Sequence, residues 1–300
     1  MNRTQFCEIS KSFVLWAGKF ECDASGNLNP SGIGGALSKI SITLDIPHSS
    51  KVQYPINGKF QFNELINQYS WRAKGMSTGD FNETRSVIES LSTDIVQANT
   101  SEDALIACKR IIGWGGDRNS KAGATIFLEK KGSGLLTYLK KVKGDLALKT
   151  AVIQTEGALS LVEKMNSMLT KIHAFNSDDG LPIYDSRVAG AIATLVETWR
   201  RTTGYANQPL PTALLFPAVG SGGFRRSVLS RYHDGHNPGS IYYFREENMV
   251  LRTSREWASA KVRLGWLLSE LLIDPNPKKI RSLEACLFMA GYNCAGINSK

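Results

Sequence analysis

From the sequence we expect no segment that directs the protein to or across a membrane. Its N-terminus, from Met1 to Lys11, mixes Cys, Glu and Lys with scattered apolar residues, whereas a secretory signal contains an unbroken apolar run of about 7–15 residues. The most apolar stretch elsewhere, 264–273, contains Ser269 and Glu270 and is far too short to cross a bilayer. We therefore expect a soluble, cytoplasmic protein.

Metal-binding and common hydrolase motifs are also missing. The five cysteines form no C-x-x-C pair, and such a scattered, odd set is typical of reduced thiols. The run 233–236, His-Asp-Gly-His, is interpreted as a turn rather than a metal site. No H-E-x-x-H or Gly-x-Ser-x-Gly pattern occurs, which argues against those hydrolase mechanisms. The sequence predicts no metal and no cofactor.

Positive charge is in excess. There are 36 Lys and Arg residues against 27 Asp and Glu, a formal net charge of +9, which indicates nucleic acid or an anionic membrane surface as a partner. Eight basic residues lie between Arg118 and Lys149, and a second basic stretch runs from 225 to 255. Such stretches bind phosphates without reading sequence. We favour nucleic acid over the alternative that these are solvated helix faces.

Hydrophobic periodicity changes at about residue 70. The positions 40, 42, 44 and 46 are all apolar and alternate with polar ones, and Asn57-Gly58 between alternating runs predicts a tight β-hairpin. Helical spacing follows. Helices are expected near 87–95, 100–113, 120–143, 157–175, 186–201 and 256–291. Thr100 and Asp103 resemble a capping pair at the start of the second of these, and Gly291 is expected to end the last. The expected class is α+β, mainly α, with a β-rich N-terminal subdomain (1–70) and a helical domain (71–300) whose catalytic segment lies within 157–201.

The most informative segment is Leu-Pro-Ile-Tyr-Asp-Ser-Arg-Val at 181–188. Gly180 and Pro182 interrupt any preceding helix, so Asp185 stands where a loop becomes a helix. Its carboxylate is expected to cap that helix and to face the positive end of the helix dipole. Position alone leaves two explanations open, an ordinary helix cap or a catalytic carboxylate.

This segment resembles the Pro-x-Val-Asp-Thr-His-Val segment of helix-hairpin-helix DNA glycosylases. Asp185 matches the family Asp, which begins a helix and faces the sugar of the flipped nucleotide, Ser186 matches the Thr, Arg187 the His and Val188 the Val. A β-rich start before a helical body is similar to the 8-oxoguanine glycosylase branch. Within that branch, the chain most resembles the bacterial phage-defence glycosylases that remove glucosylated hydroxymethylcytosine from phage DNA.

The resemblance implies a DNA glycosylase that needs no cofactor. Asp185 would stabilise the positive charge that develops on the sugar as the N-glycosidic bond breaks. The implied partner is double-stranded DNA carrying a modified base, with α-glucosyl-hydroxymethylcytosine as the first expectation. The alternatives are a repair enzyme for oxidised or alkylated bases, a non-catalytic DNA-binding protein and, least favoured, a metal-dependent nuclease.

The chain departs from the family at two points. The Leu-Pro-Gly-Val-Gly hairpin has no match upstream of Asp185, where the nearest glycine-bearing turn is 155–158. Members with lyase activity carry a catalytic lysine at a set spacing before the Asp. Lys164 lies just outside that window and Lys171 falls inside an expected helix. We therefore expect base release without strand cleavage, and keep Lys164 as a secondary catalytic candidate.

Base flipping requires a basic groove and aromatic side chains. The residues expected to bind DNA phosphates are Arg187, Arg118, Lys121, Arg225 and Arg226. The aromatic residues expected to form the base pocket or wedge are Trp114, Trp71, Tyr184 and Phe224. Ordinary core packing is the competing explanation for each aromatic residue.

Overall fold

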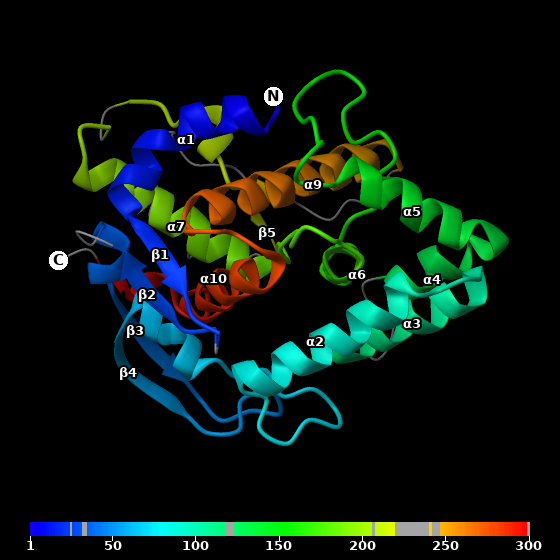
Figure 1. The fold of residues 1–300 in the computed structure, drawn as a ribbon, viewed down its shortest axis with the longest axis horizontal. Helices are drawn as coiled ribbons and strands as arrows, with labels where there is room; N and C mark the ends of the chain where they lie inside the picture. Colours follow the sequence, from blue (N-terminus) through cyan, green and yellow to red (C-terminus); the bar gives the residue numbers. More distant parts are fainter. Residues whose placement is uncertain are drawn as a thin grey trace.

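The computed structural model is mainly helical, with small sheets formed largely by the N-terminal part of the chain (Figure 1). It describes residues 1–24, 26–31, 35–117, 123–205, 208–219, 240–241 and 247–298. The α+β, mainly α class expected from the sequence is confirmed. No helix within these ranges is long and apolar enough to cross a membrane.

The chain begins with a helix, α1 (Arg3–Ala17), within the part expected to be β-rich. Its buried positions Phe6, Ser10, Phe13 and Ala17 recur every three or four residues and therefore form one helical face. Asn2 closes a capping box at the helix start. This face packs against α9 (Glu247–Glu270), near the other end of the sequence.

The N-terminal strands form two antiparallel sheets. β1 (Lys19–Cys22) pairs with β2 (Leu28–Ser31), and β3 (Ser41–Ile46) lies between β4 (Ile56–Gln61) and β7 (Ile297–Asn298). The alternation predicted for β3 is confirmed, because its buried residues occupy every second position.

The predicted turn at Asn57-Gly58 is wrong. Both residues lie inside β4, where they pair with Asp45 and Leu44, and the chain reverses instead through residues 47–55, between Ile46 and Ile56. Prolines at both ends of this loop have no N–H to donate and so end the strand pairing. Pro55 directly precedes β4, which is an edge strand of its sheet.

Two groups of helices face each other across α6 (Leu169–Phe175), which Figure 1 shows end-on. One group consists of α2 (Phe81–Val96), α3 (Ser101–Gly115), α4 (Ala124–Glu129) and α5 (Leu135–Asp145). The other contains α1, α7 (Ser186–Thr202), α9 and α10 (Pro277–Ala290). The capping box predicted at Thr100 and Asp103 begins α3.

Three predicted helices are shorter or divided. The helix expected over 120–143 is divided into α4 and α5, which are separated by a short turn at Gly132–Gly134. The helix expected over 157–175 is reduced to α6, because Gly157 and Leu159 adopt left-handed backbone angles that no helix accommodates. The helix expected over 256–291 is divided into α9 and α10, since Asp274 is also left-handed and Asn276 caps a new helix with Pro277 at its first position. Gly291 ends α10 as predicted.

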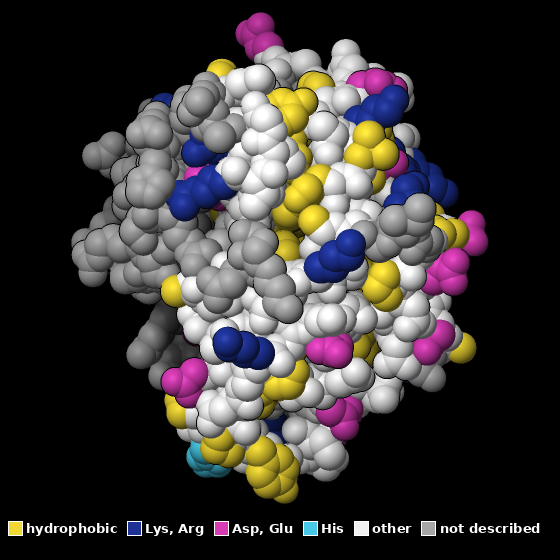
Figure 2. Space-filling model, turned by 90° about the vertical axis from the view of Figure 1, so that its left-hand side faces the viewer, with side chains coloured by type: hydrophobic (Ala, Val, Ile, Leu, Met, Phe, Trp, Pro, Cys, Tyr) yellow, Lys and Arg dark blue, Asp and Glu magenta, His cyan; other side chains and the backbone are white. Residues whose placement is uncertain are grey.

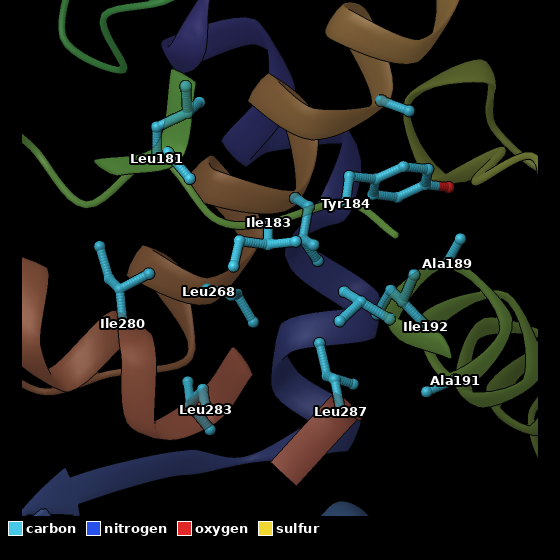
Figure 3. Packing of buried hydrophobic residues seen from close by; sticks show 14 of the residues in the cluster. Leu181, Ile183, Tyr184, Ala189, Ala191, Ile192, Leu268, Ile280, Leu283 and Leu287 are labelled. Carbon is cyan, nitrogen blue, oxygen red and sulfur yellow. The ribbon is translucent and has the colours of Figure 1, made fainter. Parts of the chain in front are cut away.

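The core between these helices holds the segment that leads to Asp185. Figure 3 shows Ile183 of this segment near Leu268 of α9 and Ile192 of α7, with Leu181 on the side of Ile280 of α10; all of these residues are buried. An extended segment, rather than a helix or a sheet strand, therefore crosses the centre of the helical body.

Candidate functional site

Asp185 caps the N-terminus of α7, as the sequence predicts. Its Oδ1 atom accepts hydrogen bonds from the backbone N–H groups of Arg187, at 3.0 Å, and Val188, at 3.1 Å. The residue is only 9% exposed. Its second oxygen, Oδ2, lies 3.9 Å from Nζ of Lys171. One carboxylate oxygen thus holds the helix start while the other faces a buried cation.

Lys171 lies on α6 and is 6% exposed. Its Nζ donates a hydrogen bond to the Ser167 carbonyl at 2.8 Å. Burial lowers the pKa of Lys171; the Asp185 carboxylate opposes this shift, and the Arg187 charge adds to it. Gly115 of α3 provides space for this side chain, because a Cβ atom there would lie 3.0 Å from the lysine Cδ.

The sequence analysis set Lys171 aside in favour of Lys164. The structure places Lys164 against α4, where Nζ reaches the Gly123 carbonyl at 3.5 Å and lies 5.8 Å from the Phe127 ring centre. The two lysines therefore differ in position, and Lys171 is the one beside Asp185. The sequence does contain an indication that Lys171 is a buried site residue, because it is the single lysine within the otherwise largely apolar segment 169–175.

A small cavity of about 40 Å³ adjoins Asp185 at the junction of α2, α3, α6, α7 and α10. A water molecule occupies roughly 30 Å³ in the liquid, so the cavity has room for water but is far smaller than the roughly 300–1,000 Å³ of ordinary ligand pockets. Its wall is largely aromatic and also contains four ionisable groups. These residues include Tyr69, Trp71, Phe81, Trp114, Lys171, Asp185, Arg281, Glu284 and Phe288.

Two of the four predicted aromatic residues line this cavity. The Trp71 and Trp114 rings lie 6.2 Å apart between centres, and Trp71 Nε1 donates to the Trp114 carbonyl at 3.2 Å. The indole N–H of Trp114 is buried without a partner among the described residues. Tyr184 instead lies in the core, where its hydroxyl donates to the Pro217 carbonyl at 2.8 Å. Phe224 lies outside the described residues.

Arg187, one of the predicted phosphate-binding residues, stacks on aromatic rings next to the cavity. Its Cζ atom lies 4.0 Å from the ring centre of Tyr292, 4.8 Å from Phe288 and 5.7 Å from Trp71. Guanidinium groups are attracted to ring faces in this way. The remaining predicted phosphate-binding residues, Arg118, Lys121, Arg225 and Arg226, lie outside the described residues.

The extended segment 181–184 is held by a buried lysine of α9. Lys261 Nζ donates to the carbonyls of Pro182, at 2.6 Å, and Thr170, at 2.7 Å. The Thr170 hydroxyl in turn accepts a hydrogen bond from the backbone N–H of Tyr184 at 3.1 Å. Lys261 is 0% exposed, and burial lowers its pKa well below the usual value. It therefore links the helix carrying Lys171 to the segment carrying Asp185.

Other side chains complete this set of contacts. Arg281 of α10 donates to the Leu181 carbonyl at 3.1 Å, and Glu284 accepts from the Ile183 N–H at 2.9 Å. Trp257 of α9 donates from its indole N–H to the Tyr184 carbonyl at 2.7 Å. We name this arrangement the segment clamp: Thr170, Trp257, Lys261, Arg281 and Glu284 around residues 181–184. The segment clamp is not predicted from the sequence, although the polar residues that form it interrupt otherwise apolar helix faces.

The face drawn in Figure 2 has no continuous basic surface among the described residues. Its Lys and Arg side chains occur in small separate groups, Asp and Glu occur in both the upper and the lower half, and hydrophobic side chains follow a narrow line in the upper half. The positive charge counted in the sequence is therefore not gathered on this face.

Family models, curated proteins and solved structures were compared with the chain, and none of them matches it. Within the described ranges, no group of three or more His, Cys, Asp and Glu side chains is arranged to hold a metal ion.

Proposed function

We propose that this protein is a DNA N-glycosylase in which Asp185 is the catalytic carboxylate. The observation that carries the proposal is the Asp185 carboxylate itself, which is nine-tenths buried beside an aromatic cavity and has Lys171 Nζ at 3.9 Å. An ordinary helix cap needs neither the burial nor the aromatic surroundings. The resemblance of residues 182–188 to helix-hairpin-helix glycosylases supports the same assignment.

The geometry suits stabilisation of a sugar cation. Breaking an N-glycosidic bond leaves positive charge on the sugar, and a fixed carboxylate at that point lowers the energy of the transition state. The two backbone N–H groups and the helix N-terminus favour negative charge at Asp185. The adjoining cavity has room for the water molecule that completes the hydrolysis.

A flipped base does not fit into 40 Å³, so the cavity must widen when DNA binds. The rings of Trp71 and Phe288 meet edge to face at 5.7 Å and belong to different parts of the chain. We expect these rings to separate and to stack on the extruded base, since stacking on aromatic side chains is how flipped bases are held. The first substrate we propose is α-glucosyl-hydroxymethylcytosine in phage DNA, which makes the biological role antiviral defence.

The test is release of free base, measured by mass spectrometry, from three DNAs. They are unmodified DNA, DNA with oxidised or alkylated bases, and phage DNA with glucosylated hydroxymethylcytosine. Release from the phage DNA supports the defence role, and release only from damaged DNA moves the proposal to repair. If the protein binds all three DNAs and releases no base, it is a DNA-binding protein without this activity.

The variant Asp185→Asn should lower base release at least about 100-fold, the usual effect of removing one charge-stabilising group. Asp80→Asn is the matched control, because Asp80 caps α2 through a side-chain hydrogen bond to the Glu83 N–H and does not line the cavity. Asparagine is also a good N-cap, so both variants should fold. Wild-type release by Asp185→Asn would refute the catalytic assignment.

Lys171 favours a second activity, cleavage of the DNA strand. Its pKa is lowered by burial, which increases the fraction of neutral amine, the form that attacks carbon. Attack of Nζ on the sugar C1′ expels the base, and loss of a proton and opening of the sugar ring give an imine. Removal of a C2′ proton then expels the 3′ phosphate. The sequence analysis predicted base release alone.

Borohydride decides between these two reactions, because it reduces the imine to a stable protein–DNA adduct. An adduct with wild type that is lost in Lys171→Gln and kept in Lys164→Gln supports strand cleavage through Lys171. Base release by wild type without any adduct supports the simpler reaction. Lys164 is the matched control because it is also partly buried but contacts Gly123 and Phe127 instead.

A further inference from the structure

A second and larger cavity lies behind the residue that precedes Asp185. It has a volume of about 690 Å³ and is bounded by α9, residues 154–159 and residues 212–217. This volume falls within the roughly 300–1,000 Å³ of small-ligand sites. Tyr184 connects the two sites, because its hydroxyl bonds the Pro217 carbonyl in the wall of this cavity and its chain neighbour is Asp185.

Arginine dominates the charge of the described wall. Arg252, Arg255 and Arg263 all line the cavity, against a single carboxylate, Glu256. The three arginines lie three, eight and eleven positions apart on α9, which are spacings of about one, two and three helical turns, so they share one helical face. The described wall therefore carries an excess of two positive charges. We name this set the arginine cavity.

Arg263 is the most unusual member of the set. It is 4% exposed, and its Nη1 donates to the carbonyls of Thr212, at 2.8 Å, and Ala213, at 3.1 Å. Its Nε is buried without a hydrogen-bond partner among the described residues. No carboxylate in the described part of the chain forms an ion pair with the Arg263 guanidinium. Burial lowers its pKa to about 10. A buried cation of this kind is costly unless an anion compensates it.

Arg255 repeats this pattern nearer the surface. Its Nη2 donates to the Ser160 carbonyl at 3.2 Å, while its Nε is also buried without a partner in the described part of the chain. Hydroxyl groups of Thr155, Thr212 and Ser259 also line the cavity. Guanidinium and hydroxyl donors together form the typical environment of a bound phosphate.

We propose that the arginine cavity binds a phosphate ester through Arg252, Arg255 and Arg263. A phosphomonoester carries about −1.5 to −2 charge at pH 7, which matches the excess of two positive charges. The ester comes either from a free nucleotide or from the backbone of a bound DNA strand. Only the second source depends on the proposed glycosylase function.

The experiment compares wild type with the double variant Arg252→Gln/Arg255→Gln. Both residues are at least partly exposed, so the variant is expected to fold, which circular dichroism checks. Lys11→Gln, an exposed change on α1, is the control for loss of a positive charge away from the cavity. The probes are inorganic phosphate and deoxycytidine monophosphate in titration calorimetry, and a 15-base-pair duplex in fluorescence anisotropy at several salt concentrations.

Two results support the proposal and identify the source. Binding of deoxycytidine monophosphate that weakens at least about 10-fold in the double variant, but not in Lys11→Gln, indicates a free nucleotide. For the duplex, the logarithm of the binding constant is plotted against the logarithm of the salt concentration. A slope that is smaller in magnitude by about two in the double variant indicates a DNA phosphate. If the double variant and wild type bind all three probes equally, the proposal is wrong.

A gain of affinity provides a second test that misfolding cannot imitate. Glu256 is the carboxylate of the described wall and repels an anion, so Glu256→Gln should strengthen binding of the phosphate ester several-fold. Weaker or unchanged binding in this variant contradicts the proposal. These measurements do not involve base release, so loss of the glycosylase assignment leaves the result for the free nucleotide intact.

Discussion

Two extended segments of this protein satisfy their backbone hydrogen bonds in opposite ways. The β3 strand pairs with β4 from Ser41↔Gln61 to Ile46↔Ile56, and its first two residues also pair with β7, so its ladder partners on both sides are backbone groups. The segment 181–184 is held by side chains, with partners 14 residues away at Thr170 and between 73 and 101 residues away on α9 and α10. A backbone ladder tolerates many side chains, whereas the segment clamp depends on particular ones.

The largest effect is expected where the segment clamp is broken at Lys261. Lys261→Met keeps most of the side-chain volume but leaves the Pro182 and Thr170 carbonyls without their donor. Each buried carbonyl without a partner costs about 1–3 kcal/mol, so we expect the free energy of unfolding to fall by about 3 kcal/mol. Urea unfolding measures it. A stability equal to wild type would show that the clamp does not hold the segment.

The second prediction concerns α6, which carries Thr170 of the clamp. Burial, aided by the Lys261 charge, lowers the pKa of His173 to about 3. The unfolded chain binds a proton at this imidazole below about pH 6.5 and the folded chain does not, so the free energy of unfolding falls as the pH decreases. Between pH 7 and pH 5 protonation of this imidazole in the unfolded chain lowers the free energy of unfolding by about 2 kcal/mol, and His173→Leu should abolish this decrease. Identical pH profiles of urea unfolding would contradict this.

A smaller effect is expected from Trp257→Phe. The ring keeps its packing, but the Tyr184 carbonyl loses the indole donor at 2.7 Å. One lost hydrogen bond with a buried acceptor costs about 1–2 kcal/mol. Urea unfolding of this variant and of Lys261→Met, measured in parallel, shows which of the two substitutions lowers the free energy of unfolding more. Lower stability of the Trp257 variant would mean that the lysine is not the main contact.

The smallest effect is expected in the strand ladder. Lys59 is exposed on β4 and pairs with Thr43 through backbone groups. Lys59→Gln should therefore change the free energy of unfolding by less than about 0.5 kcal/mol. A loss comparable to that of Lys261→Met would remove the distinction between the two segments.

Patterns that involve neighbouring residues were predicted correctly. The caps at Thr100 and Asp185 and the alternation in β3 depend on spacings of two to four residues, which the sequence displays directly. The turn at Asn57-Gly58 failed because the prolines of the 47–55 loop moved the chain reversal. A turn signal is also local, but strand register depends on which segments finally pair.

The candidate site shows the same division. The sequence singled out Asp185, Trp71 and Trp114 by motif and residue type, and the structure brings all three to one cavity. It passed over Lys171, because the irregular chain before α6 and the short connection after it changed the expected spacing. Residue type was informative, whereas distance along the chain was not.

The sequence by itself determined the mainly helical class, the helix that begins at Asp185 and the excess of positive charge. Each of these follows from composition or from contacts within one or two helical turns. Only the tertiary structure decided that Lys171 faces Asp185, that Lys261 is buried against Pro182, and that the arginines of α9 line a cavity. These contacts join residues up to about a hundred positions apart, which are brought together by the packing of apolar helix faces. Many different sequences satisfy such packing, so the sequence does not display which residues will meet.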